Sequence, residues 1–291
     1  MIDSHHHIWR QQDLPWLLGP EQPRIFGSYY SIKRDYLIDE YLRDVSSAGI
    51  EKSVYVQANW SPNWAADEAA WVQSVADEYG WPHAIVGYAD FTTAQVRSQL
   101  DKLAECDLMR GVRQQLHWHE NPQYRFAARD NIASDRYFQE NIKLLAEYNW
   151  CFDLQVFSGQ MPHAIALVEA CPEVTFILQH AGMLEDTSEA GFDQWQQMMS
   201  ALARYENVAV KLSGLGTFTH RVDIELMNRI VSLTVETFGA QRCMFGSNFP
   251  IEKIWTSYEE LCVAMNTVTA QYSDSDRQEI FNDTAKRLYR L

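Results

Sequence analysis

Long apolar runs are missing from this sequence, and none of them approaches the ~20 residues that a membrane-spanning helix needs. The start of the chain has no basic segment followed by an apolar stretch, so we expect no signal peptide. Low-complexity tracts and linkers rich in proline, glycine or serine are absent as well. These absences argue against membrane-spanning and low-complexity proteins, and they favour a globular chain in the cytoplasm.

Positive charge is also scarce, because 24 Lys and Arg stand against 39 Asp and Glu, which gives a formal net charge of −15. Such a chain repels phosphate backbones and anionic lipid head groups, so we exclude nucleic acids and membranes as partners.

The five cysteines are odd in number, lie in apolar stretches and lack zinc-knuckle spacing. That pattern is typical of buried free thiols in a reducing compartment.

What the sequence does contain is a regular alternation of short β-rich runs with longer amphipathic stretches. The eight expected strands are rich in Val, Ile, Phe and Tyr, and they cover residues 1–5, 52–58, 83–90, 110–116, 151–157, 174–180, 208–214 and 243–248. Helical patterns between them stand out at residues 36–49, 64–80 and 135–149. Alternation of this kind indicates βαβ units and a parallel sheet.

The number of these units predicts the fold. Eight of them in 291 residues match an α/β protein with a (β/α)8 TIM barrel as a single domain, residues 1–291. An open doubly wound sheet is the alternative, but no glycine-rich phosphate loop follows the first strand. Near the end of the chain, Thr256 with Glu259 and Ser275 with Gln278 have capping-box spacing and predict the starts of the last two helices.

The first expected strand runs directly into three histidines, in the segment MIDSHHHIW. Alternate side chains of a strand share a face, so His5 and His7 point one way and His6 the other. In a TIM barrel the active site lies at the carboxyl ends of the strands. Two imidazoles there can bind a metal ion or polarise a carbonyl oxygen. Taken alone, the motif is equally compatible with the remnant of a purification tag.

Polar residues at the other strand ends favour an active site. His180 ends the sixth expected strand and Asn248 ends the eighth. Five further residues on the intervening strands are candidates for substrate binding: Gln57, Arg113, Asp153, Gln155 and Lys211. Trp60 and Trp118 follow the second and fourth strands, where aromatic side chains can stack on a ring-shaped substrate.

Two of these candidates bring positive charge into an acidic protein. Arg113 suits a substrate carboxylate as a planar two-point clamp, and Lys211 would act as a point charge. Each could instead pair with Asp90 or Asp153 inside the barrel, and the sequence leaves this open.

The segments MIDSHHHIW, QHAG, KLSG, MFGSNFP and FNDTAKRLYRL, in this order and spacing, resemble the amidohydrolase superfamily. More narrowly they resemble its lactonase-type "amidohydrolase 2" branch, which includes sugar-acid lactonases and 2-pyrone-4,6-dicarboxylate lactonase. The resemblance covers residues 2–291. It implies a TIM-barrel hydrolase in which water attacks the ring carbonyl of a small acidic lactone. His5, His7, His180 and Asn248 are the catalytic candidates.

The chain departs from the metal centre that this resemblance implies. The superfamily has a bridging Lys or Glu on strand four, a His on strand five and an Asp on strand eight. Here the fourth strand has Arg113, the fifth has no histidine and the eighth has Asn248. Too few anionic ligands remain to neutralise two divalent ions close together, so we expect no two-metal site.

Two possibilities for the metal therefore stay open. One Zn²⁺ could bind to His5, His7 and His180, with a fourth position for water. Alternatively no metal binds, and the imidazoles and the Asn248 amide donate hydrogen bonds to the substrate carbonyl oxygen.

Asn248 also leaves the identity of the general base open, because an amide has no useful basicity. The candidates are a neutral histidine, either His180 or His119, and the carboxylate of Asp153. Two other functions on the same barrel remain as alternatives. One is decarboxylation of an aromatic or semialdehyde acid, and the other is a catalytically degenerate, ligand-binding protein. The sequence does not name the lactone, and a homo-oligomer is compatible with it.

Overall fold

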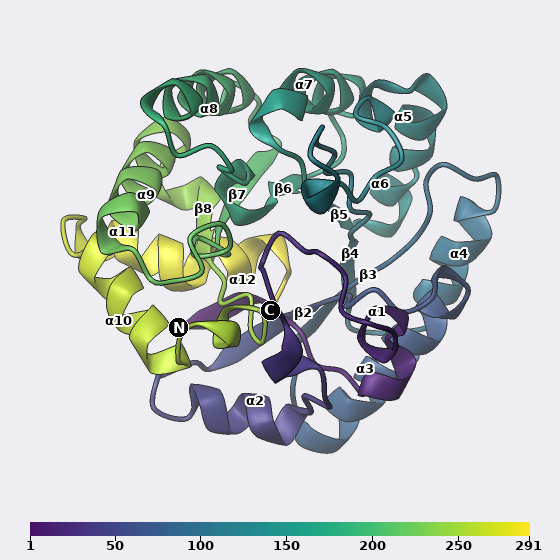
Figure 1. The fold of residues 1–291 in the computed structure, drawn as a ribbon. Helices are drawn as coiled ribbons and strands as arrows, with labels where there is room; N and C mark the ends of the chain where they lie inside the picture. Colours follow the sequence, from purple (N-terminus) through teal and green to yellow (C-terminus); the bar gives the residue numbers. More distant parts are fainter.

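The computed structural model describes residues 1–291, and its centre is a barrel of eight parallel strands that follow one another in chain order (Figure 1). The strands are β1 (Ile2–His6), β2 (Lys52–Val56), β3 (Ala84–Gly87), β4 (Met109–Val112), β5 (Cys151–Leu154), β6 (Phe176–Leu178), β7 (Val208–Leu212) and β8 (Cys243–Phe245). All eight expected strands are confirmed, although most end earlier than expected. The polar residues at the expected strand ends therefore lie just beyond the strands.

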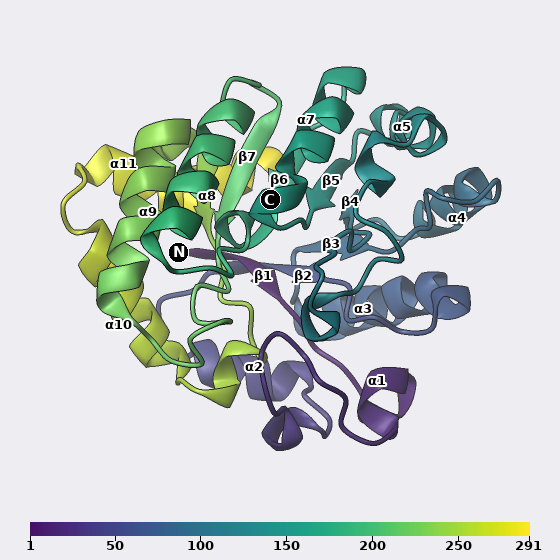
Figure 2. The same ribbon diagram turned by 45° about the horizontal axis from the view of Figure 1, so that its top comes forward.

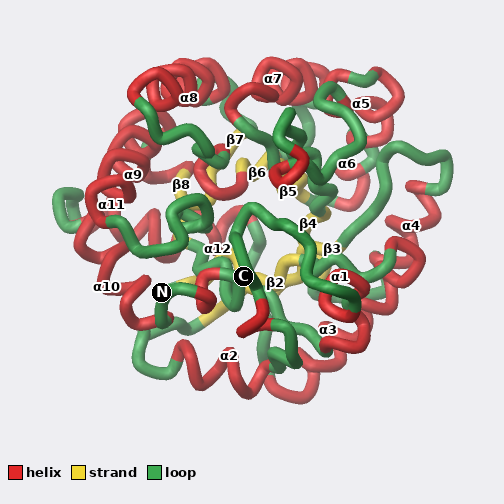
Figure 3. The backbone as a smooth tube through the Cα atoms, in the orientation of Figure 1, coloured by secondary structure: helices red, strands yellow, loops and turns green.

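Helices surround this barrel, as the red ring around the yellow strands shows in Figure 3. They are α1 (Pro15–Leu18), α2 (Ile38–Val45), α3 (Ala65–Tyr79), α4 (Val96–Leu103), α5 (Arg136–Ile142), α6 (Leu145–Tyr148), α7 (Met161–Ala170), α8 (Glu189–Leu202), α9 (Ile224–Phe238), α10 (Tyr258–Thr269), α11 (Asp274–Gln278) and α12 (Thr284–Leu288). Turned by 45°, α7, α8 and α9 lie side by side as one outer wall (Figure 2). No helix combines the length and apolar character that a membrane crossing requires. The predicted TIM barrel is confirmed.

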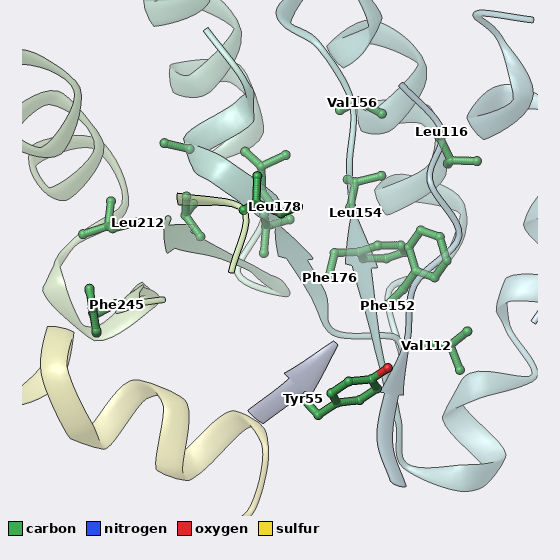
Figure 4. Close-up of a cluster of buried hydrophobic side chains, with 14 of the residues drawn as sticks. Tyr55, Val112, Leu116, Phe152, Leu154, Val156, Phe176, Leu178, Leu212 and Phe245 are labelled. Atoms are coloured by element: carbon green, nitrogen blue, oxygen red, sulfur yellow. The ribbon is translucent and has the colours of Figure 1, made fainter. Parts of the chain in front are cut away.

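Alternation along the strands divides the apolar side chains into two cores. One set packs outward against the helices and belongs to a cluster of 71 buried residues; in Figure 4 it includes Tyr55, Val112, Phe152, Leu154, Phe176, Leu178, Leu212 and Phe245. A second cluster of 11 buried residues fills the barrel, with Val54, Val56, Ile177, Ala209 and Met244 among its members. Burial of both faces explains why the strands read as continuous apolar runs. The five cysteines are free and buried, as predicted.

The end of the chain belongs to the inner core. Tyr289, just after α12, is fully buried in the inner cluster, and its hydroxyl donates a hydrogen bond to Asp153 of β5 at 2.9 Å. Open space for a ligand is therefore left at the other end of the barrel.

An irregularity in β1 decides which histidines face the interior. The register between β1 and β2 shifts between Asp3 and His6, which marks a β-bulge. His6 faces outward and stacks on Tyr41 of α2, with 3.9 Å between the ring centroids. Its neighbours His5 and His7 point inward, as the strand pattern predicts.

The barrel closes between β8 and β1 through both backbone and side chains. The backbone N–H of Asn248 donates to the carbonyl of His5 at 2.7 Å. Beside this bond, the buried Asp3 carboxylate accepts five hydrogen bonds, from the His5 and Ser247 backbone N–H groups and from the Ser247, Tyr41 and Tyr258 hydroxyls. Apart from the His5 N–H of β1 itself, these donors come from α2, α10 and the segment after β8, so Asp3 ties both ends of the sheet to the surrounding helices. We call this group the Asp3 seam.

Candidate active site

A cavity opens at the carboxyl ends of the strands. Five of the predicted site residues line it: His7, Arg113, Gln155, His180 and Asn248. The segment between β1 and α2, purple in Figure 1, crosses the mouth of the barrel and contributes Arg24 and Phe26 to the lining. Three arginines line the cavity, whereas no aspartate or glutamate does. In a chain with an excess of acidic residues, this cavity is built for a ligand with negative charge or electronegative oxygens.

Three histidine rings cluster at the base of this cavity, where His7 and His180 belong to the lining and His5 does not. The ring centroid of His5 lies 5.1 Å from that of His7 and 4.8 Å from that of His180. His5 is fully buried, and its Nδ1 is 3.4 Å from the side-chain amide nitrogen of Gln179. Its Nε2 has no hydrogen-bond partner in the protein. The first and sixth strands thus bring their histidines together, as the sequence predicts.

The other two histidines are held through Nδ1. His7 Nδ1 lies 2.6 Å from the carbonyl oxygen of Val56 at the end of β2, so this nitrogen carries the proton and donates. His180 Nδ1 lies 2.9 Å from the hydroxyl of Ser213, just after β7. The Nε2 atoms of His7 and His180 are therefore left free for a ligand.

The backbone around His180 explains the motifs QHAG and KLSG. His180 lies in η7 (Gln179–Gly182) with φ of 53°, in the left-handed region, and Gly214 after β7 has φ of 60°. A Cβ on residue 214 would lie 2.6 Å from His180 Nδ1. Glycine is required at position 214 because both its backbone conformation and the neighbouring ring exclude a side chain.

All three imidazoles are neutral at physiological pH. Burial lowers the pKa of His180 to about 3, and the positive charges of Arg113 and Lys211 act in the same direction. Burial also lowers the pKa of His5 and His7 well below the usual value, with help from Lys211 and Arg113 for His5 and from Arg113 for His7. Neutral imidazoles can donate a hydrogen bond, accept a proton or bind a metal ion.

Arg113 provides a cation without a carboxylate partner. It is 3% exposed, and its guanidinium donates to the side-chain oxygen of Gln179 at 3.3 Å and to the backbone carbonyl of Gln57. Its Nε has no partner. Burial lowers the pKa of Arg113 to about 10, so it stays charged at neutral pH. An unpaired buried cation beside a cavity is well placed to bind an anionic group of a ligand.

Asp153 and Lys211 do not line the cavity. Both are fully buried in the barrel, and Lys211 Nζ lies 2.6 Å from the Asp153 carboxylate. The same carboxylate accepts hydrogen bonds from Gln179 at 2.8 Å and from Tyr289 at 2.9 Å. These partners favour the alternative of a structural ion pair, and Gln179 connects it to both His5 and Arg113.

Three other predicted binding residues also lie outside the lining. Gln57 is buried, and its side-chain oxygen accepts from the backbone N–H of Asn59 at 2.6 Å. Trp60 stacks on Trp71, with 5.9 Å between centroids. Trp118 packs beneath the Arg125 guanidinium, 5.0 Å from its ring centroid. The aromatic surface of the cavity comes instead from Trp9, Trp16, Phe26, Tyr124, Phe126 and Phe218.

Asn248 has a neighbour that the sequence analysis does not single out. Asn248 is 5% exposed, has φ of 57° and lines the cavity just after β8. Glu252 follows one turn later at the start of η9 (Glu252–Ile254), and its buried carboxyl lies behind the Asn248 and Thr217 side chains. In the sequence, the only sign of this neighbour is that a glutamate follows Asn248 by four residues.

The histidine cluster suits a zinc ion in chemical type. Two imidazoles on one tetrahedral zinc, with Zn–N of ~2.0–2.1 Å, have ring centroids about 5 Å apart, close to the spacings of His5 from its neighbours. The unpartnered Nε2 of His5 and the free Nε2 atoms of His7 and His180 are suitable donors. However, no three His, Cys, Asp or Glu side chains lie in an arrangement that could hold a metal ion. Binding of zinc would therefore require the rings to move.

Comparison with known proteins agrees with this architecture. The family model described as "Amidohydrolase" matches residues 2–291. The chain belongs to the amidohydrolase family. It is thus an enzyme of the hydrolase type, as the resemblance of its motifs predicts.

Three relatives of this amidohydrolase are informative. An uncharacterized protein of Sinorhizobium fredii is 34% identical over 293 residues, covering 100% of this chain and 98% of the relative. An L-fucono-1,5-lactonase of Burkholderia multivorans is 26% identical, covering 100% of this chain and 96% of the relative. A crystal structure of an amidohydrolase from Burkholderia multivorans, with bound zinc, has a TM-score of 0.83 and 26% identity, covering 100% of this chain and 99% of the other.

Proposed function

We propose that this amidohydrolase opens a small acidic lactone by attack of water on the ring carbonyl. The observation that carries the proposal is the composition of the cavity: neutral imidazoles, an asparagine amide and an unpaired arginine, without any carboxylate in the lining. The similarity to L-fucono-1,5-lactonases supports a lactone as the substrate class. The three cavity arginines support a carboxylate on that lactone.

The polar groups divide into two roles. His5 and the Asn248 amide lie on one side of the cavity base and can donate hydrogen bonds to the carbonyl oxygen as it gains negative charge, whereas His7 donates through Nδ1 to Val56 and presents only the lone pair of its Nε2. Arg113 binds the carboxylate and fixes the orientation of the ring. Binding and activation thus come from different sides of the same cavity.

His180 is the base that fits best among the three candidates. Its Nδ1 can donate to Ser213, which leaves the Nε2 lone pair free to accept a proton from water. Asp153 is held below the cavity by Lys211, and His119 Nδ1 accepts a hydrogen bond from the Asn121 backbone outside the lining. Neither of them reaches the cavity.

An acidic substrate would also strengthen this base. After burial, the charge of Arg113 is the largest cause of the lowered pKa of His180. A substrate carboxylate paired with Arg113 neutralises that charge and raises the pKa of His180 toward the range of a useful base. Substrate binding and base activation are therefore coupled through Arg113.

Whether a metal takes part is a separate question. The residues that would bind zinc are His5, His7 and His180. Zinc, when bound, polarises a carbonyl oxygen and lowers the pKa of a water molecule to ~7. The roles of Arg113 and Asn248 do not depend on it.

The test of the proposed function is turnover of a panel of aldono-lactones and pyrone dicarboxylates by the purified protein. We expect acid release that depends on His180, so that the His180→Gln variant loses at least about 100-fold in kcat/KM. The same panel should contain aromatic acids, with release of carbon dioxide as the readout. Decarboxylation without lactone turnover would replace the proposal, and tight lactone binding without turnover would indicate a degenerate enzyme.

Metal dependence is tested by elemental analysis of freshly purified wild-type protein and of His5→Ala. A functional zinc site predicts about one zinc per wild-type chain, little in the variant, and loss of turnover in chelator that added zinc restores. Turnover that is unchanged after complete chelation would show that the reaction needs no metal, with His5 as a hydrogen-bond donor and His180 as the base.

A further inference from the structure

Glu252 is a buried carboxyl that the mechanism above does not use. It is 1% exposed, and the indole N–H of Trp255 donates to its Oε2 at 2.9 Å. Its Oε1 has no completed hydrogen bond, although the side chains of Thr217 and Asn248 lie against the carboxyl. Thr217 and Asn248 both line the cavity. Glu252 therefore lies directly behind two residues that line the cavity, and its Oε1 has no hydrogen-bond partner.

No cation neutralises this carboxyl. Lys253, the next residue, turns away to Asp44 at 2.6 Å. On the other side, η2 (Tyr30–Ile32) packs against η9, but Tyr30 is exposed and the following Lys33 donates to the Gly19 carbonyl. The remaining titratable group nearby is the His220 imidazole, which packs on the ring of Trp255, with 5.8 Å between their centroids.

We propose that Glu252 is a positioning residue, and that the proton on its carboxyl decides which end of the Asn248 amide faces the cavity. In the protonated form, the carboxyl O–H donates to Asn248 Oδ1, so the amide N–H₂ points into the cavity and donates to the substrate carbonyl. In the ionised form, the carboxylate accepts from Asn248 Nδ2, and Oδ1 turns toward the substrate carbonyl oxygen. The first orientation stabilises the developing oxyanion and the second repels it.

This inference rests on the proposed function for its effect on the reaction, and it predicts a pH dependence. Burial without a cation raises the pKa of Glu252 to about 8. The fraction of protonated Glu252, and with it kcat/KM, should fall about tenfold between pH 7 and pH 9. His5, His7 and His180 are neutral throughout this range, and Arg113, with a pKa of about 10, is still largely charged.

The decisive variant is Glu252→Gln, whose amide N–H₂ donates to Asn248 Oδ1 at every pH. We expect the ratio of kcat/KM at pH 7 to that at pH 9, corrected for spontaneous lactone hydrolysis, to fall from about ten to about one. Glu185→Gln is the matched control, because burial also raises the pKa of Glu185, to about 7, but this residue does not line the cavity. It should keep the alkaline decline. A decline that persists unchanged in Glu252→Gln would overturn the proposal.

A second measurement separates this inference from the proposed function. The side-chain amide signals of ¹⁵N-labelled Asn248, assigned by their loss in Asn248→Asp, should shift with a midpoint near pH 8 in the wild-type protein and stay constant in Glu252→Gln. This readout needs no substrate. If no lactone is turned over but the amide titrates, the proposed substrate class is wrong and the positioning role stands. An amide that does not titrate in the wild-type protein would refute the positioning role, whatever the enzyme hydrolyses.

Discussion

Among single residues, Arg113 gives the most specific prediction about the ligand, because its charge favours a ligand with a carboxylate. We expect Arg113→Met to raise KM for an acidic lactone by about 10- to 100-fold, because a charge-assisted hydrogen bond contributes about 1.5–3 kcal/mol. Initial rates at pH 7 check this value. The change should be larger for the acidic lactone than for a neutral lactone with the same ring.

Arg110→Met is the matched control for this experiment. Arg110 belongs to the same strand, β4, but it donates to the backbone carbonyls of Asp107 and Met109 and does not line the cavity. Equal losses in the two variants, or an equal loss for the neutral lactone, would mean that Arg113 supports the fold and does not bind a carboxylate.

Gly214 offers a test of how closely the His180 ring must be placed. An added methyl group would lie 2.6 Å from His180 Nδ1, so Gly214→Ala must displace the ring or the strand end. Misplacement of a reacting group by about 1 Å can cost about 100-fold in rate, and we expect a loss of this size in kcat/KM. Gly159→Ala is the control, since its new Cβ meets nothing within 4 Å. Full activity of folded Gly214→Ala would argue against His180 as the base.

For single residues, the sequence predicts which way a side chain points better than it predicts whether the side chain reaches the cavity. The two-residue period of a strand correctly directs His5, His7 and Gln155 inward. The same period also directs Asp153 and Lys211 inward, but it does not show that they lie below the cavity, where they pair with each other. The cavity aromatics come from long connections without periodicity. Such segments carry no pattern from which their path could be predicted.

Among the elements, the junction of β8 with β1 depends on a single carboxylate, Asp3. Burial raises the pKa of Asp3, while its hydrogen bonds oppose this shift. Asp3→Asn removes one acceptor oxygen and points an N–H₂ group at donors such as the Tyr41 and Tyr258 hydroxyls. We expect the free energy of unfolding to fall by about 2–4 kcal/mol, because buried donors are left unpaired. Urea unfolding at pH 7 measures this change.

Asp39→Asn on α2 is the control for the Asp3 variant, because the Asp39 side chain is exposed and forms no hydrogen bond with the protein. It should change stability by less than about 0.5 kcal/mol. If Asp3→Asn is as stable as this control, the Asp3 seam contributes little to closing the barrel.

The elements themselves were predictable in number and kind, and less so in their bounds. The capping box of α10 is Ser257 with Glu260, one residue after the predicted pair Thr256 and Glu259. Serine and threonine are adjacent there, as are two glutamates, so spacing alone allows either pair. The start of α11 was also misplaced, since its N-cap is Ser273 and not Ser275. The helix expected over residues 135–149 is interrupted between α5 and α6.

For the whole molecule, buried titratable groups predict a narrow optimum of stability. Five buried histidines have a lowered pKa in the folded state, about 3 where a value is resolved: His5, His6, His7, His117 and His180. The unfolded chain, with a histidine pKa near 6.5, binds more protons in acid. Their contribution to stability is therefore complete above pH 6.5 and is lost as the pH falls toward 3.

Two buried glutamates and the partly buried Glu185 act in the opposite direction. Burial raises the pKa of Glu68 and Glu185 to about 7 and that of Glu252 to about 8. Their contribution is complete below the unfolded value of about 4.5 and is lost as the pH rises through 7 to 8. We expect the free energy of unfolding to be largest between about pH 6 and 7, measured by urea unfolding at half-unit steps. Stability that keeps rising from pH 7 to 9 would contradict this assignment of buried charges.

The Asp3 seam also constrains how the enzyme is made. The first strand leaves the ribosome early, but the groups that hold Asp3 include Ser247 and Tyr258, which are among the last to be synthesised. Tyr289, which closes the far end of the barrel, follows later still. Nascent chains that end before these residues therefore contain His5, His7 and His180 but cannot assemble the active site. Catalytic competence should appear only when translation is nearly complete.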